Sequence, residues 1–178
     1  HIEALIGRSQ ALQHLGRHDQ AIADWKFLLE NHTRGFSGRR AMFLNGLAYA
    51  QALGNTQLES ALEHVNAALD LVGHDGAILD TRGYIHYQRG DYKSARADLD
   101  LAVSMIEKDF EFHQEEHDLR QYVDRRTHEA DFRARARNVA VIRYHRALVY
   151  DALDKPDQAE RDRRRVRELG FEPGEDLF

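Results

Sequence analysis

A spaced pattern of small and apolar residues recurs four times along the chain, and this repetition constrains the fold more than any other feature. In each copy an apolar run reaches a turn, and an alanine then opens a second apolar run. The second and third of these alanines are separated by one period of about 34 residues, whereas the other two intervals are longer. Repetition near this period is typical of helix pairs that stack and share one core. The four alanines are Ala21, Ala61, Ala95 and Ala159.

The positions of proline and glycine favour an all-helical chain. Only two prolines occur, Pro156 and Pro173, and the glycines fall mainly between the apolar runs, so long stretches have no helix breaker. We expect the first helix of a pair to end at a glycine that can adopt a left-handed conformation, as at Gly16, Gly54 and Gly90. The predicted helix pairs are 2–15 with 18–31, 38–53 with 58–71, 76–89 with 92–108, and 132–153 with 156–169.

The third copy carries the most complete version of the pattern, which consists of Gly83, the run Gly90-Asp91-Tyr92, Ala95, Leu99 and Ala102. This pattern resembles the tetratricopeptide repeat (TPR) family, in which each unit of about 34 residues is a helix pair. The resemblance implies an all-α, right-handed superhelical solenoid of antiparallel helix pairs. It implies a single array over 1–178, with units at about 2–34, 38–73, 76–108 and 132–170 and an insertion at about 109–131.

The same resemblance implies a function in protein–protein interaction rather than catalysis. In this family the first helices of successive pairs line a concave groove that holds a peptide or protein segment. Tyrosine suits such a groove because it presents both an apolar ring and a hydroxyl group. For each polar candidate the alternative is an ordinary solvated helix face. The groove candidates on the first helices are Gln10, Asn45, Tyr49, Asp80, Tyr84, Gln88 and Tyr144.

The insertion at 109–131 is charged, yet it contains aromatic side chains such as Phe110. Leu119, Tyr122 and Val123 have the i, i+3, i+4 spacing of a short amphipathic helix. Three alternatives therefore remain open: a lengthened connection, an extension of the next helix, and a surface for self-association into a homo-oligomer.

A histidine pair within the insertion is the one pattern that suggests metal chemistry. His113, Glu116 and His117 match H-x-x-E-H, and histidines four residues apart on a helix can share a zinc ion. A zinc peptidase also needs a third ligand and an enclosing domain, for which a repeat array of this length leaves no room. The chain has no cysteine and no glycine-rich phosphate loop. We expect no metal, no cofactor and no catalytic residue.

Charge is distributed unevenly along the chain. The formal net charge is −5, but residues 119–168 hold 14 basic residues against nine acidic ones. Arginine pairs well with both carboxylates and phosphates, and ion pairing on helix surfaces is the favoured interpretation. The alternative is binding of nucleic acid or another anion, a less favoured partner class. The arginines that would serve it are Arg125, Arg126, Arg133, Arg135 and Arg137.

No apolar run approaches the ~18 residues of a membrane-spanning helix, so we expect no membrane segment. The chain begins with His1 rather than methionine. The compartment is therefore left open, with a weak preference for the cytoplasm.

Overall fold

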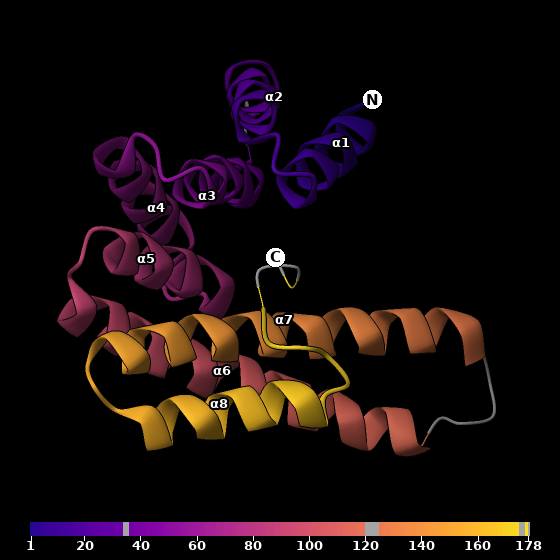
Figure 1. The fold of residues 1–178 in the computed structure, drawn as a ribbon. Helices are drawn as coiled ribbons and strands as arrows, with labels where there is room; N and C mark the ends of the chain where they lie inside the picture. The colour runs from indigo at the N-terminus through magenta and orange to yellow at the C-terminus, as the bar shows by residue number, and fades with distance from the viewer. Residues whose placement is uncertain (34–35, 120–124, 175–176, 178) are drawn as a thin grey trace.

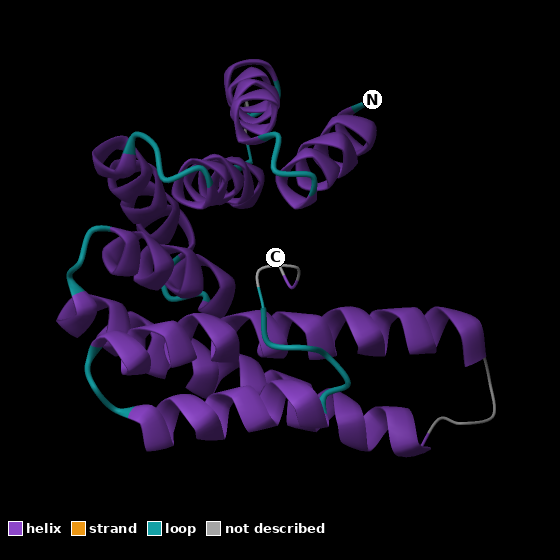
Figure 2. Cartoon of the chain, viewed as in Figure 1, coloured by secondary structure: helices purple, strands orange, loops and turns teal. Residues whose placement is uncertain are grey.

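The computed structural model describes residues 1–33, 36–119, 125–174 and 177, and the side chains of 114–128 fall outside this description. Over these residues the chain is all-α, with eight helices in which each helix packs against its successor (Figure 2). The helices are α1 (Ile2–His14), α2 (His18–Asn31), α3 (Ser37–Leu53), α4 (Leu58–Val72), α5 (Gly76–Gln88), α6 (Tyr92–Leu119), α7 (Arg125–Ala152) and α8 (Pro156–Glu168).

The turns within the helix pairs follow the glycine prediction at two of its three positions. Gly16 and Gly90 adopt left-handed conformations, with φ of 68° and 78°. The prediction is wrong at Gly54, whose φ is −75°. The turn between α3 and α4 contains one residue more than the other turns, and its left-handed residues are Asn55 and Gln57. The longer turn thus moves the change of chain direction past the glycine.

Small residues let the two helices of a pair approach closely. All four repeated alanines have no exposed surface. At Gly83 on α5, an added Cβ atom would lie 2.6 Å from the Cγ of Leu99 and 3.2 Å from the carbonyl oxygen of Ala95. At Gly46 on α3, it would lie 2.6 Å from the ring of Trp25 in the preceding pair. The chain therefore requires glycine both within a pair and between pairs.

An ion pair recurs in three of the four helix pairs with identical spacing and geometry. In each, the Nε and Nη2 atoms of an arginine on the first helix donate to the two carboxylate oxygens of an aspartate 16 residues later on the second helix. Each aspartate stands three residues after the repeated alanine. In the remaining pair His64 occupies that position, with its Nδ1 atom 3.1 Å from Gln51 Oε1. The three ion pairs are Arg8–Asp24, Arg82–Asp98 and Arg146–Asp162.

The insertion lengthens the two helices that flank it. Helix α6 continues to Leu119 and α7 already begins at Arg125, so both are longer than predicted. The added part of α6 packs on α7 through Phe110 and Phe132, whose ring centroids are 5.2 Å apart. The short helix predicted around Tyr122 falls largely within 120–124, outside the described residues.

The helix pairs follow one another in an arc, and α1, α3 and α7 border its inner side (Figure 1). Helix α5 contacts both α3 and α7, so it connects the two arms of the arc. None of the helices in the described part of the chain is long and apolar enough to cross a membrane.

Candidate functional site

The inner side of the arc contains a cavity of about 440 Å³. Its walls come from α1, α3, α5 and α7, the first helices of all four pairs, with single contributions from α2 and α6. The lining residues are Gln10, Gln13, His14, Trp25, Met42, Asn45, Gly46, Tyr49, Ala77, Asp80, Thr81, Ile106, Arg137, Asn138, Val141, Ile142 and Leu177.

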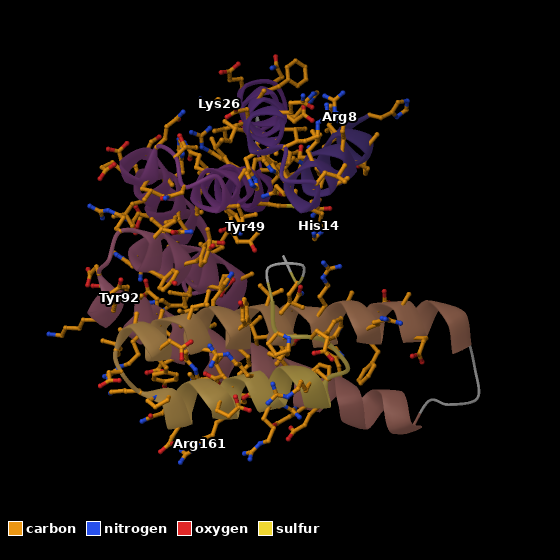
Figure 3. All side chains as sticks on the ribbon, in the orientation of Figure 1. Arg8, His14, Lys26, Tyr49, Tyr92 and Arg161 are labelled. Carbon is orange, nitrogen blue, oxygen red and sulfur yellow. The ribbon has the colours of Figure 1, made fainter. Side chains whose placement is uncertain are left out.

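Four of the seven predicted groove residues line this cavity together. Gln10 comes from α1, Asn45 and Tyr49 from α3, and Asp80 from α5. Figure 3 shows the side chains of Tyr49 and His14 pointing into the space between their helices and α7. Residues far apart in the sequence thus meet because successive first helices lie side by side.

The other three candidates lie outside the cavity lining. Tyr84 is buried, with its ring stacked on His145 at a centroid distance of 4.3 Å. Gln88 donates a hydrogen bond of 2.9 Å to the Tyr84 hydroxyl. Tyr144 packs against an apolar cluster that includes Leu177. Helix α7 packs against α5, so the face of α5 that carries Tyr84 forms a helix–helix contact.

A buried polar pair joins α5 to α7 next to the cavity. The His145 Nδ1 atom lies 2.8 Å from Asp80 Oδ1, and both side chains are almost fully buried. Tyr49 packs edge-on against His145. Burial raises the pKa of Tyr49 well above its usual range, and the negative charge of Asp80 raises it further. The Tyr49 hydroxyl therefore remains protonated and can donate a hydrogen bond.

Three residues of the lining carry buried polar atoms that have no hydrogen-bond partner among the described residues. These atoms are Gln13 Nε2, Trp25 Nε1 and Asn45 Oδ1. A buried polar group without a partner costs about 1–3 kcal/mol, and a hydrogen-bonding ligand can recover this cost where a rotation of the side chain brings the atom to the cavity surface. The first two are donors and the third is an acceptor, so the set matches the carbonyl and N–H groups of a peptide.

The cavity also includes residues that the repeat pattern did not indicate. Arg137 on α7 donates through Nε and Nη2 to the carbonyl oxygen of Leu177, at 3.4 and 3.2 Å. Its Nη2 atom lies 3.5 Å from the Nδ1 atom of His14 on α1. Arg137 belonged to the predicted anion-binding arginines, whereas nothing in the repeat pattern pointed to Leu177.

Several other arginines of the C-terminal part are engaged by carboxylates. Arg135 pairs with Asp109, and Arg143 pairs with both Glu107 and Asp162. Arg163 pairs with Asp151, and Arg167 pairs with Glu160. The side chains of Arg125 and Arg126 lie outside the described residues.

The histidine pair of the insertion is only partly described. His113 Nε2 lies 3.6 Å from Asp109 Oδ1, an i, i+4 contact along α6. The side chains of Glu116 and His117 lie outside the described part of the chain.

Neither the protein-family models nor the curated proteins include a match to this chain. The function is therefore inferred from the site itself. Amide, hydroxyl and indole groups stand beside apolar side chains such as Ile106, Val141 and Ile142. This mixture suits a ligand that presents backbone hydrogen-bonding groups together with an apolar side chain.

Proposed function

We propose that this chain is a TPR-like right-handed solenoid that binds a protein segment in its concave face and has no catalytic activity. The observation that carries the proposal is the cavity of about 440 Å³, to which all four helix pairs contribute and in which three buried polar atoms have no partner among the described residues. An extended peptide supplies donors, acceptors and apolar side chains at spacings that one small molecule rarely matches.

Two recurrences support the assignment to stacked repeat units. The buried alanines recur in all four pairs, and the interval between Ala61 and Ala95 matches the family period of about 34 residues. The arginine–aspartate pair with its separation of 16 residues recurs in three pairs. Unrelated helices have no reason to share both features at corresponding positions.

The proposal can be tested by selecting peptides from a phage library of random dodecapeptides on the immobilised wild-type chain. The selected peptides are then measured against two variants, Gln10→Trp and Gln20→Trp. Both glutamines are exposed, but only Gln10 lines the cavity. The two substitutions are therefore matched in chemistry and differ in their position relative to the site.

A tryptophan at position 10 fills part of the cavity, so we expect it to weaken the selected peptides at least fivefold. The same change at position 20 should leave their affinity unchanged. If the library yields no specific peptide, or if both variants bind as wild type does, the concave face is not the binding site.

A further inference from the structure

The α7 side of the cavity is bordered by residues that follow α8 in the sequence. After α8 the backbone turns back and residues 170–174 cross α7 toward the inner side of the arc (Figure 1). Leu177 lines the cavity and is only 5 % exposed. Residues 171–178 are called here the C-terminal segment, of which the structure describes 171–174 and 177.

We infer, on the basis of the proposed function, that the groove takes an acidic protein segment anchored by a leucine, and that Leu177 of the C-terminal segment occupies the place of this leucine within the chain. A partner segment with the same chemical features then binds by displacing the C-terminal segment.

The contacts of Leu177 show what the anchor requires. Its side chain shares an apolar cluster with Ala140 and Val166, against which Tyr144 packs. Its carbonyl oxygen accepts two hydrogen bonds from the guanidinium of Arg137. One residue is thus recognised through both its side chain and its backbone. Its N–H donates to the carbonyl oxygen of Gly174, so a leucine at a similar turn of another segment can repeat these contacts.

Charge complementarity indicates the residues that should flank this leucine. The C-terminal segment contains Glu172, Glu175 and Asp176 and no basic residue. The cavity wall beside Leu177 carries Arg137, with His14 next to it. Opposite charge favours the approach and the correct register of an acidic segment, more strongly at low salt.

The position of the C-terminal segment means that a partner must compete with it. Tyr144, which was expected in the groove, packs instead against the cluster that contains Leu177, as Phe171 does. The α7 part of the inner face becomes accessible when these residues leave. Because the segment is covalently attached, its local concentration is in the millimolar range, so it lowers the apparent affinity of any external segment.

The experiment uses the full chain and a synthetic copy of residues 171–178, acetylated and amidated: Phe-Glu-Pro-Gly-Glu-Asp-Leu-Phe. Binding is followed by the fluorescence of Trp25, the one tryptophan of the chain, which lines the cavity. The peptide itself contains no tryptophan or tyrosine. The receptors are the wild type and Leu177→Asp, in which the buried carboxylate expels the attached segment. Leu177→Ser serves as a second variant, and circular dichroism verifies that each receptor is folded.

We expect Leu177→Asp to bind the peptide at least tenfold more tightly than wild type does. A peptide with aspartate in place of its leucine should bind at least tenfold more weakly. Adding Arg137→Met to the Leu177→Asp variant should weaken binding about fivefold or more. The matched control Arg161→Met should have no effect, because Arg161 points away from the cavity on α8 (Figure 3).

Equal affinity of wild type and both Leu177 variants, or binding to none of them, overturns the inference. The random library separates this failure from a failure of the proposed function. Library peptides that bind wild type and Leu177→Asp equally, without enrichment of leucine beside acidic residues, leave the groove function intact and reject the C-terminal segment as its occupant. Library peptides with that enrichment and tighter binding to Leu177→Asp support the inference.

Discussion

The recurring arginine–aspartate pair provides a series of three equivalent interactions that differ mainly in burial, and Asp162→Asn is the most informative change in it. Asp162 is 1 % exposed and lies between Arg143 and Arg146, which are 18 % and 13 % exposed. Its Oδ1 atom accepts from both arginines and its Oδ2 atom accepts from Arg146. Asparagine has the same shape but directs an NH₂ group at one of these donors.

The expected loss of stability in Asp162→Asn follows from leaving a buried charge without its partner. Burial by itself lowers the pKa of Arg146, but the hydrogen bonds and the charge of Asp162 outweigh this effect and raise it on balance. The variant loses that compensation, yet its guanidinium stays charged because the pKa of arginine lies far above neutral pH. Removing one member of a buried ion pair costs about 3–5 kcal/mol. At about 2–4 °C per kcal/mol for a chain of this length, the melting temperature should fall by about 10 °C.

The equivalent changes in the other pairs should cost less, in order of exposure. Arg82 is 26 % exposed, so Asp98→Asn should cost about 2 kcal/mol, as for a charged hydrogen bond near the surface. Arg8 is 61 % exposed, so Asp24→Asn should have the smallest effect of the three. The assay is urea unfolding followed by far-ultraviolet ellipticity, with the midpoint compared at constant slope. Equal losses for all three variants, or the largest loss at Asp24, would refute the argument from burial.

Three further predictions concern packing, the insertion and pH. Gly83→Ala should destabilise the chain by about 1–3 kcal/mol because its Cβ meets Leu99, whereas Gly7→Ala, with open space around it, should stabilise by up to about 1 kcal/mol; thermal melts of both variants test the opposite signs. Phe110→Ala should cost about 3–5 kcal/mol, since Phe110 is 2 % exposed and packs on Phe132, and protease cleavage near the insertion should accelerate. Burial lowers the pKa of His64 and of His86, the latter despite Asp98 and Asp91, so stability from these groups is present above pH 6.5 and is lost as pH falls below it. Urea midpoints at pH 7.5 and 5.5 should show this loss, and it should be smaller in the double variant His64→Gln/His86→Gln.

Seven of the eight helix starts, to within one residue, and two of the three glycine turns could be predicted, because they depend on neighbouring residues. Pro156 begins α8, where its missing N–H has no intrahelical acceptor to lose. The lengths of α6 and α7 could not be predicted in this way. The charged residues after 108 contain no helix breaker, but a helix is favoured there only when Phe110 packs against Phe132. That contact joins two segments that are distant in the sequence.

The candidate site shows the same division between local and distant causes. Asn45 and Tyr49 are four residues apart on α3, so helical periodicity places them on one face, and both line the cavity. Tyr84 follows Asp80 with the same spacing, yet only Asp80 reaches the cavity. The difference is caused by α7, which packs its His145 onto the Tyr84 ring. No spacing within α5 contains that information.

Helix α7 also explains how a residue outside the cavity can control its shape. Arg137, Val141 and His145 succeed one another at intervals of four residues, so they share one face of α7. The first two line the cavity, and the third is fixed to α5 by its contact of 2.8 Å with Asp80. The buried pair therefore determines how closely that face of α7 approaches α5. It thereby sets the distance between Arg137 and His14 on α1, the opposite wall. The polar pair that excludes Tyr84 from the groove is, on this argument, the element that positions Arg137, the arginine on which the proposed preference for acidic segments rests.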